Sequence, residues 1–493
     1  MQTVAGGPIT SLKKNLAYNI TYQLLIIILP LITAPYVSRV LGVDGVGRFS
    51  YIYSIAFYFG MFGMLGISNH GNRSIALSKN DPNRTSAVFS NIYCIQFCTT
   101  SIVFVLYILF VSFLFNGNKT VAYIDSLYVL ATMLDINWLF FGLEKFKLTV
   151  TRNLLFKLGT IVCIFIFVKN TSDLWKYTLI LALGTTISQV YLWFYVRKYV
   201  HLTRPNLNEI KKHIMPIFAL FIPVIAYSIY KVMDKIMLGS ITNMTQVGLF
   251  ENSEKIVGIP VGIITAFGTV MMPRISSLIA DKNPSQIDIY NRLSFKYFTF
   301  IALGMVFGLV GISNVLPSVY FGEEFADCSR LIAGLSFTLI FMTWANIIRT
   351  QYLIPNKNDK PYIVSTVVGA AVIIVVNLIL IPRFQAVGAL VGTLIAEFLV
   401  FFIQMMYVRK EFPVLNYLKN GIAFFPIGVF MCIVVHLIGT KMRLSLITLV
   451  VQICVGGVLY LLLSLIYFLA TKDEIVNAIL MIIRKQRVFG KNT

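Results

Sequence analysis

The stretch NLAYNITYQLLIIILPLITAPYVSR, residues 15–39, decides the class of fold. Its central part, Leu24 to Leu31, is an unbroken apolar run without alternating polar residues, which indicates a membrane-spanning helix and not a strand of a barrel. Lys13 and Lys14 precede the run, but it is too long for the core of a signal peptide and shows no clear small-residue cleavage site. We therefore expect an uncleaved first span.

The rest of the chain has the same character. Of its 493 residues, 57% are hydrophobic and 12% are charged, whereas soluble domains are roughly 45–50% apolar and about 25% charged. This composition argues against a cytosolic enzyme and excludes intrinsic disorder. It favours one all-α polytopic membrane unit. Apolar windows predict about fourteen transmembrane helices, at residues 15–39, 47–68, 86–115, 120–142, 149–168, 174–196, 214–238, 247–272, 293–316, 328–353, 361–381, 387–408, 416–438 and 444–471.

The distribution of cations sets the orientation. With both termini in the cytoplasm, 26 Lys and Arg residues fall on the cytoplasmic side and nine outside, in agreement with the positive-inside rule. The same rule explains the net charge of +21 better than nucleic-acid binding does. Residues 472–493 are typical of a basic amphipathic surface helix. The longest loops, near 197–213 and 273–292, have about 17–20 residues, too few for a soluble catalytic domain.

Weak internal similarity indicates a duplication. Four pairs of segments match in order, at offsets of 197, 201, 206 and 212 residues: 41–42 with 238–239, 46–49 with 247–250, Trp138 with Trp344, and 195–198 with 407–410. The step from 197 to 201 requires a four-residue insertion in the second half. Because each repeat holds an even number of spans, both halves keep one orientation, and their interface is the expected substrate site. The predicted domains are an N-terminal six-helix lobe (1–205), a C-terminal six-helix lobe (206–412), helices 13 and 14 (413–471) and a basic cytoplasmic tail (472–493).

Two features of the spans point to the site. The first and seventh spans each carry two prolines, which mark either moving, substrate-lining helices or ordinary kinks. Ionisable residues inside spans cost at least ~2.5–3.5 kcal/mol each unless they meet a partner or water. The candidates are Lys231, Asp234 and Lys235 in the seventh span, Glu251, Glu254 and Lys255 in the eighth, Asp135 in the fourth, Arg349 in the tenth and Glu397 in the twelfth.

Spacing brings some of these residues onto shared helix faces. Lys231 and Asp234 are three residues apart, and Glu251 and Lys255 are four apart. Because the seventh and eighth spans are consecutive, their charged faces can meet. They form either a neutral salt-bridge network or a hydrated cavity whose cations hold an anionic headgroup. Three carboxylates are also candidates for coupling to protons or sodium: Asp135, Asp234 and Glu397.

Signatures of catalysis are missing from the sequence. It contains neither GxxxxGK[ST] nor HExxH, and its six cysteines form no CxxC pair. We expect a protein that is not an enzyme, with no cofactor and no metal site.

Seven segments, in order over most of the chain, resemble the polysaccharide transporters of the MOP (multidrug/oligosaccharidyl-lipid/polysaccharide) exporter superfamily, the Wzx-type flippases of O-antigen and capsule pathways. The segments are PYVSRVLGVDGVGRFSY (35–51), LDINWLFFGLEKFK (134–147), YKVMDKIMLG (230–239), VGLFENSEKI (247–256), MMPRIS (271–276), RTQYLIPNKNDKPY (349–362) and VGALVGTLIAE (387–397).

The resemblance implies a MATE-like fold, with two six-helix lobes around a central cavity and two extra helices. It implies flipping of an undecaprenyl-diphosphate-linked oligosaccharide across the bacterial cytoplasmic membrane, with membrane lipid, a polysaccharide polymerase and a chain-length regulator as further partners. Lys235, Lys255 and Arg349 fall in matching motifs and are expected to contact diphosphate or sugar.

Four more residues in the resembling segments complete the substrate-binding candidates: Lys231, Arg39, Arg48 and Trp138. The related peptidoglycan-lipid flippases place arginines within the first span. Here Arg39 lies at the outer end of that span, which counts against that sub-branch.

Three alternatives remain. A MATE-type exporter of small molecules with the same fold needs a net-negative cavity, and the embedded charges here are nearly balanced. A major-facilitator transporter would carry GxxxDRxGRR after its second span, where this chain has SNHGNRSIALSKNDPNR (68–84). A membrane-bound polysaccharide polymerase would usually need a large outside loop, and none is predicted.

Overall fold

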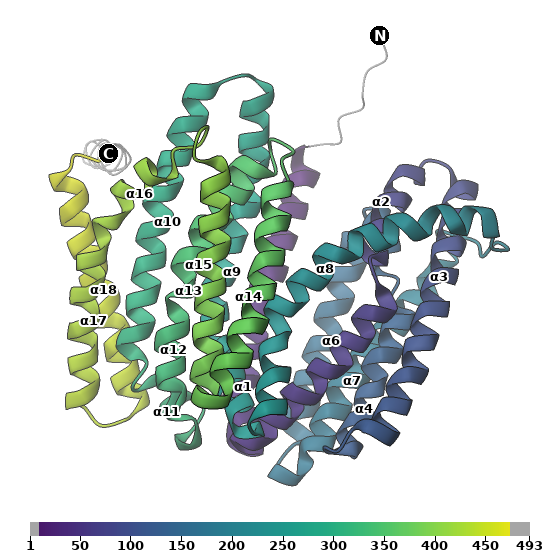
Figure 1. The fold of residues 1–493 in the computed structure, drawn as a ribbon, viewed down its shortest axis with the longest axis horizontal. Helices are drawn as coiled ribbons and strands as arrows, with labels where there is room; N and C mark the ends of the chain where they lie inside the picture. The colour runs from purple at the N-terminus through teal and green to yellow at the C-terminus, as the bar shows by residue number, and fades with distance from the viewer. Residues whose placement is uncertain (1–8, 474–493) are drawn as a thin grey trace, which may run out of the picture. The chain divides into compact units, whose positions relative to one another are not determined.

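The computed structural model describes the backbone of residues 9–473 and the side chains of residues 29–473 (Figure 1). Within this part of the chain, thirteen segments are long and apolar enough to cross a membrane. The first, Leu29–Ser78, contains a break at Gly42 and so holds two of the expected spans. The predicted all-helical fold with about fourteen spans is thus confirmed. The predicted surface helix of the tail lies, from residue 474 on, outside the described residues.

The chain divides into two compact units. Unit 1 comprises Met1–Lys255 and Thr366–Ala396. Its elements are α1 (Ile9–Met64), α2 (Ile67–Ser78), α3 (Pro82–Leu109), the π-helix η1 (Phe110–Leu114), α4 (Lys119–Leu134), α5 (Asn137–Gly142), α6 (Phe146–Phe167), the 3-10 helix η2 (Thr171–Asp173), α7 (Leu174–Val196), α8 (Leu207–Ile241), the first part of α9 (Met244–Ala280) and parts of α14 (Lys360–Phe384) and α15 (Ala386–Val408).

Unit 2 comprises Ile256–Ser365 and Glu397–Thr493. It holds the remainders of α9, α14 and α15. Its other elements are α10 (Pro284–Ile312), α11 (Leu316–Tyr320), the 3-10 helix η3 (Glu323–Phe325), α12 (Cys328–Ser336), α13 (Thr338–Ile348), the π-helix η4 (Arg349–Leu353), α16 (Val414–Ile422), α17 (Phe424–Lys441) and α18 (Leu446–Ala470). The division into two lobes at residue 205 stays a prediction.

Helix ends follow local signals in the sequence. α3 begins after Asp81, whose carboxylate accepts hydrogen bonds from the backbone N–H groups of Asn83 and Arg84, with Pro82 in the first turn. α10 begins in the same way after Asn283. These side chains satisfy donors that a helix leaves unpaired at its start. One expectation was wrong, because α9 and α10 are joined by only three residues, 281–283. Both helices run on through most of the predicted 273–292 loop.

The break in α1 falls at a glycine and not at a proline. Gly42 has φ 70°, a left-handed conformation that glycine adopts without steric cost. Pro30 and Pro35 lie inside the continuous helix, as do Pro216 and Pro223 in α8. Whether these prolines mark moving, substrate-lining helices or ordinary kinks stays a prediction. The discontinuity that reorients the chain lies between the first two expected spans.

A second discontinuity lies within the fourth span, where α4 ends at Leu134 and α5 begins at Asn137. The Gln96 amide nitrogen donates to the carbonyls of Thr132 and Asp135, each at 2.8 Å. The Trp193 indole donates to the carbonyl of Leu134 at 3.0 Å. A broken helix is tolerated at membrane depth only when its freed backbone groups find partners. These two side chains supply them.

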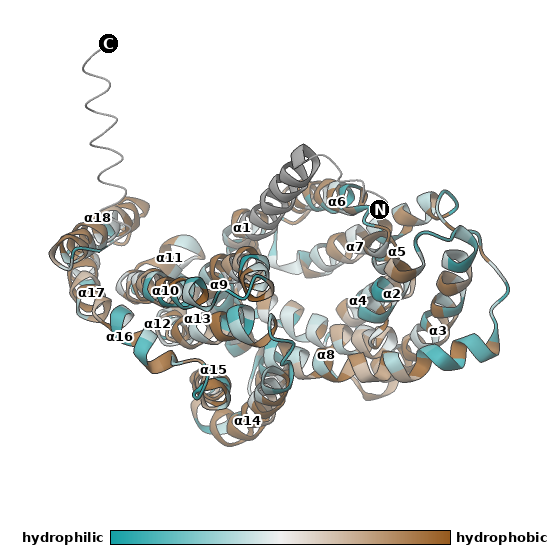
Figure 2. Cartoon of the chain, turned by 90° about the horizontal axis from the view of Figure 1, so that it is seen from above, coloured by the Kyte–Doolittle hydropathy of each residue, from teal (hydrophilic) through white to brown (hydrophobic). Residues whose placement is uncertain are grey.

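Buried apolar clusters hold each unit together. In unit 1 the cluster joins α1, α2, α3, α5, α7 and α8 and includes Phe89 and Trp138. In unit 2 a cluster joins α10, α13, α15 and α16 around Phe295. Figure 2 shows hydrophobic residues along α14, α17 and α18, whereas α2 is largely hydrophilic. Exposed apolar helix surfaces of this kind suit contact with lipid.

The internal repeat has a structural counterpart in the two indoles that match in sequence. Trp138 donates to the Gln96 side chain at 2.9 Å, and Trp344 donates to the hydroxyl of Thr299 at 2.9 Å. The acceptors are 203 residues apart and the donors 206 apart. The two halves thus use equivalent positions for the same kind of contact.

The repeats also approach each other directly within unit 1. A Cβ atom on Gly47 would lie 1.8 Å from the backbone oxygen of Met244, and one on Gly248 would lie 2.1 Å from the backbone oxygen of Val43. Both pairs are related by the same offset of 201 residues. Such a reciprocal contact is expected at a pseudo-two-fold axis, where a segment of one repeat contacts the equivalent segment of the other. The paired glycines allow two backbones to touch there.

Candidate functional site

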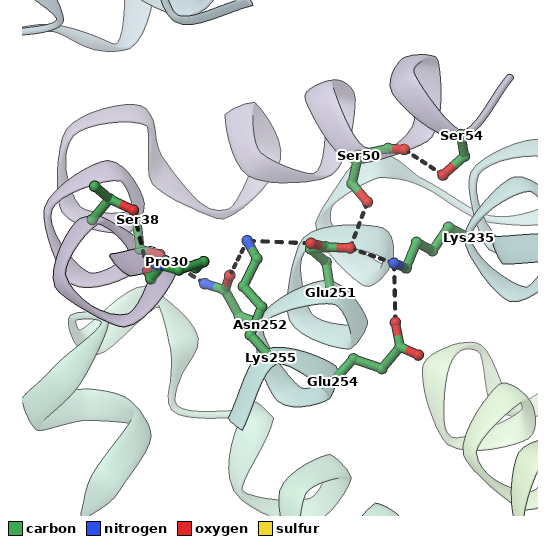
Figure 3. Close-up of polar contacts among 10 residues, drawn as sticks. Pro30, Ser38, Ser50, Ser54, Lys235, Glu251, Asn252, Glu254 and Lys255 are labelled. Atoms are coloured by element: carbon green, nitrogen blue, oxygen red, sulfur yellow. Dashed lines mark hydrogen bonds and ion pairs between the residues drawn. The ribbon is translucent and has the colours of Figure 1, made fainter. Parts of the chain in front are cut away.

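Four of the predicted residues form one ionic network, which we call the charge network: Lys235, Glu251, Glu254 and Lys255. The Lys235 ammonium lies 2.7 Å from a Glu251 carboxylate oxygen and 3.0 Å from Glu254. Lys255 lies 3.3 Å from the other oxygen of Glu251. Figure 3 shows these side chains converging from α8 and α9. Glu251 is the hub, because it alone contacts both lysines.

The charge network is anchored to α1. The Ser50 hydroxyl donates to Glu251 at 2.8 Å. Lys255 donates to the side-chain oxygen of Asn252 at 3.2 Å, and the nitrogen of that amide donates to the Ser38 hydroxyl at 2.7 Å. The network therefore ties α1, α8 and α9 together (Figure 3). It lies close to the α8–α9 turn, since Lys235 is six residues before the end of α8 and Glu251 seven after the start of α9.

The network carries two positive and two negative charges. Its side chains are 16–32% exposed, so they are partly screened and reachable by water. Of the two predicted readings, the neutral salt-bridge network is the arrangement present in this structure. Direct contact between these lysines and an anionic headgroup stays a prediction.

The repeat gives the charge network an asymmetric character. The matching segments align Glu251 with Ser50 and Lys255 with Ser54, both at the offset of 201. With the four-residue insertion before this segment, Lys235 aligns with Ser38. Ionisable residues of the second repeat thus stand at positions where the first repeat has serines. One of these pairs, Ser50 and Glu251, is also joined by a hydrogen bond. A sequence comparison of the two halves could have found this pattern.

Asp234 belongs to a separate cluster. It is 4% exposed, and one carboxylate oxygen accepts from the Asn377 amide on α14 at 2.5 Å. The other oxygen accepts from the Thr393 hydroxyl on α15 at 3.0 Å. Three helices thus converge on one carboxylate within unit 1. We call these three residues the Asp234 cluster.

A third group surrounds Arg152, near the start of α6. The guanidinium is 3% exposed and donates to the side-chain oxygens of Asn153 at 2.6 Å, Asn137 at 3.0 Å and Gln189 at 3.0 Å. Asn137 in turn donates to Asp135 at 2.6 Å. We call Arg152, Asn137, Asn153 and Gln189 the amide cluster. It lies beside the broken helix at Asp135.

The remaining candidates lie apart from these groups. Arg39 is exposed, and Arg48 pairs with Asp44 at 2.5 Å while about half exposed. Lys231 is partly buried, and Trp138 is buried in the apolar cluster of unit 1. In unit 2, Arg349 donates to Asn346 at 2.7 Å and lies over the Tyr362 ring, and Glu397 is buried. Their predicted contacts with substrate or coupling ions stay predictions.

The polar face of α6 is not among the predicted features of the site. Arg152 is expected among the cytoplasmic cations, and Asn153, Lys157 and Thr160 have no predicted role. In TRNLLFKLGT (151–160) these polar residues recur at helical spacing within an apolar span. Such a stripe inside a membrane helix indicates contact with a polar interior. The polar stripe is visible in the sequence. Arg152 follows the predicted start of the span at residue 149 by only three residues and therefore counts with the cytoplasmic cations.

Comparison with known proteins supports the reading of the fold. The chain is 23% identical over 413 residues to an Escherichia coli K12 protein assigned as an O-antigen transporter, covering 81% of this chain and 97% of that one. It is 23% identical over 379 residues to the capsular polysaccharide biosynthesis protein CapF of Staphylococcus aureus, covering 75% and 92%. A solved structure of the lipid II flippase MurJ superposes with TM-score 0.75 at 15% identity, covering 93% and 99%. This superposition confirms the expected fold.

The family follows from a direct match of the chain to a family model. The model of polysaccharide biosynthesis proteins matches residues 12–279, more than half of the chain. The matched range contains the charge network, Asp234 and the amide cluster. This chain belongs to the polysaccharide biosynthesis protein family, in the Wzx-type branch of the MOP superfamily that its motifs resemble.

Proposed function

We propose that this protein flips an undecaprenyl-diphosphate-linked oligosaccharide repeat unit from the inner to the outer leaflet of the bacterial cytoplasmic membrane. The observation that carries the proposal is the gathering of ionic and amide side chains inside apolar, membrane-length helices of unit 1. A helix bundle that serves only as a scaffold does not need these groups in lipid, where each is costly. The names of the relatives, an O-antigen transporter and a capsule biosynthesis protein, agree with such a cargo.

The physical task explains why polar side chains are needed. A glycan and a diphosphate cannot enter hydrocarbon without losing their hydration, whereas the prenyl tail is at home there. In the proposed mechanism the headgroup crosses through a hydrated, charged cavity while the tail stays in lipid, and alternating access exposes one face at a time. This mechanism makes and breaks no covalent bond. The repeat unit then passes to a polymerase and a chain-length regulator, and both termini of the flippase stay in the cytoplasm.

The charge network has a defined part in this proposal. Lys235 and Lys255 would exchange carboxylate oxygens for phosphate oxygens as the headgroup passes, because both acceptors offer similar charge-assisted hydrogen bonds. Glu251 and Glu254 would restore the closed network afterwards. The exchange is feasible since the four side chains are partly exposed.

The first prediction concerns these two lysines. Lys235→Gln and Lys255→Gln are each expected to lower export at least about tenfold, the effect of losing ~1.4 kcal/mol in a rate-limiting contact, with normal insertion into the membrane. The measurement is made in the native strain with the gene deleted and further substrate synthesis blocked inducibly. Lipid-linked oligosaccharide is extracted and quantified by mass spectrometry. Deletion should cause a single repeat unit on undecaprenyl diphosphate to accumulate and surface glycan to disappear.

A matched control is Lys176→Gln, which removes an exposed lysine paired with Asp173 at the start of α7. It should complement the deletion fully. Full activity of both charge-network variants would remove the role given to these lysines. Absence of accumulation together with normal surface glycan and altered drug susceptibility would instead support a small-molecule exporter of the same fold.

We also propose that the Asp234 cluster couples transport to a cation. A buried carboxylate with an amide and a hydroxyl oxygen beside it has the chemistry to hold a proton or a sodium ion. Asp234→Asn keeps the shape of the side chain. The asparagine amide can still form a hydrogen bond with the Thr393 hydroxyl, as donor or as acceptor, so the fold should persist.

The prediction is that Asp234→Asn loses the acceleration that an imposed gradient gives. Flipping of a fluorescent lipid-linked oligosaccharide is measured in proteoliposomes with a sodium or a pH gradient, and with neither. The natural protein should respond to one gradient and the variant to none. If the variant responds as strongly as the natural protein, the cluster has no coupling role.

A further inference from the structure

A cavity of about 430 Å³ lies within unit 1, between α1, α6 and α7. Among residues 29–473, whose side chains the structure describes, its lining contains two cationic side chains, Arg152 and Lys157, and no carboxylate. Hydroxyl and amide groups make up most of the remaining polar lining, and Phe156 and Tyr177 add aromatic surface. A pocket of a few hundred Å³ with a few placed polar groups is typical of a small-ligand site.

Lys157 lies at the centre of its helix. It is eleven residues after Phe146 and ten before Phe167, the two ends of α6, which places it about 15 Å from either end along the helix axis. A lysine side chain cannot reach a membrane interface over that distance. The ion pairs within residues 29–473 do not include Lys157. An ammonium at mid-span that lines a cavity is a functional residue by default.

Arg152 gives the cavity its polarity indirectly. A guanidinium can only donate hydrogen bonds, and it donates to the side-chain oxygens of Asn153 and Gln189. Each amide is therefore held with its oxygen toward Arg152 and its NH₂ group turned away from it. Both residues line the cavity. Arg152 is thus a positioning residue that makes two amides act as donors, and their polarity adds to the charge of Lys157.

The carboxylate of Asp135 does not cancel this polarity. Asp135 is separated from Arg152 by the side chain of Asn137, which donates to Asp135 and accepts from Arg152. Asp135 does not line this cavity. Counting Arg152, Lys157 and Asp135 together still leaves one positive charge, and among the described residues the charged groups at the cavity wall are both cations.

We propose that this cavity binds the carboxylate of an acidic sugar, so that the glycan carried by the protein contains a uronic-acid type unit. The inference rests on the proposed function, because it assigns a chemical class to the cargo. The Lys157 ammonium and the amide NH₂ groups suit the two carboxylate oxygens. Threonine hydroxyls of the lining, such as Thr33 and Thr160, both donate and accept, as sugar hydroxyls require.

The test is a binding measurement on the purified full chain in detergent. Isothermal titration calorimetry compares a uronic-acid disaccharide with the neutral disaccharide of the same linkage, and with inorganic pyrophosphate. The acidic disaccharide should bind and the neutral one should bind at least about tenfold more weakly. Lys157→Gln should weaken binding of the acidic disaccharide by about 10- to 100-fold, the loss expected for one charge-assisted hydrogen bond.

Two further variants guard against misfolding. Lys147→Gln makes the same change on the same helix outside the cavity and should leave the affinity unchanged. Replacing Arg152 itself could unfold the bundle, so Gln189→Glu is used instead. It keeps the size, places a carboxylate beside Arg152 where it can pair, and should abolish binding of the acidic sugar while the melting temperature is maintained.

Each outcome decides the proposal. Equal binding of acidic and neutral disaccharides, or an unchanged affinity in Lys157→Gln, overturns it. Binding of pyrophosphate without binding of the acidic disaccharide assigns the cavity to the lipid diphosphate and also overturns it. Because this readout needs no transport, its failure is distinct from failure of the flippase proposal, which the accumulation of lipid-linked oligosaccharide tests separately.

Discussion

Glu251→Gln is expected to lower the stability of the folded protein by about 3 kcal/mol, the lower end of the cost of removing one partner from a buried ion pair, because the side chains of the network are partly buried. Glu251 contacts both Lys235 and Lys255, and it also accepts from Ser50 on α1. Its neutralisation leaves Glu254 as the one carboxylate of the charge network. Glu254 contacts Lys235, so Lys255 loses its ionic partner in the network. The protein should unfold at a clearly lower temperature when the purified chain is heated and intrinsic fluorescence is followed.

Glu254→Gln is the matched control. Glu254 contacts only Lys235 within the charge network, at 3.0 Å, and its side chain is 30% exposed where that of Glu251 is 17% exposed. Removing a more exposed partner costs less, about 1 kcal/mol or below. If Glu251 is the hub of the charge network, Glu251→Gln must lower the melting temperature more than Glu254→Gln does. Equal shifts for the two variants would mean that the four charges act as independent surface pairs.

Gly47→Ala and Gly248→Ala are expected to prevent accumulation of folded protein, with a cost of about 4 kcal/mol or more each. The added Cβ atoms would lie 1.8 Å and 2.1 Å from backbone oxygens, which cannot move aside as the end of a flexible side chain can. Relief would need the two repeats to separate where they touch. The measurement is the yield of monodisperse protein in size-exclusion chromatography after expression under identical conditions.

The control is Gly159→Ala on α6. A Cβ atom there meets nothing within 4 Å. Alanine is the better helix former by roughly 0.5–1 kcal/mol, so this variant should be neutral or slightly more stable. Normal yield of both Gly47→Ala and Gly248→Ala would show that the backbones are not in contact in the folded protein.

The spans and the charge network could be predicted because each depends on regular spacing. Apolar runs of the right length give the helices. Lys235, Glu251 and Lys255 come together because consecutive helices present their i, i+4 faces to each other. The partners of the network could not be predicted in the same way. Ser50 and Ser38 are small neutral residues on α1, and only the three-dimensional approach of that helix brings them into contact.

The amide cluster shows a different limit. Arg152 follows a basic stretch with Lys145 and Lys147, so the positive-inside rule predicts that it is a cytoplasmic cation. Its role depends on Asn137 and Gln189, which lie 15 and 37 residues away along the chain. Amides carry no periodic signal of their own, and a hydrogen bond between distant segments leaves no mark in one sequence. The polar stripe of α6 indicates a polar interior, but the amide partners from other helices that complete the cavity could not be predicted from spacing.

The hydrogen bond between Ser50 and Glu251 bears on the ancestry of the protein. If the two halves descend from one gene, an earlier form was a dimer of identical half-length chains, and this position then faced its own copy across the axis. Two serines can share a hydrogen bond there, whereas two glutamates at 2.8 Å would repel each other. A single carboxylate at this contact requires that the two halves differ in sequence. A half-length relative that pairs with itself should therefore keep a neutral residue at this position.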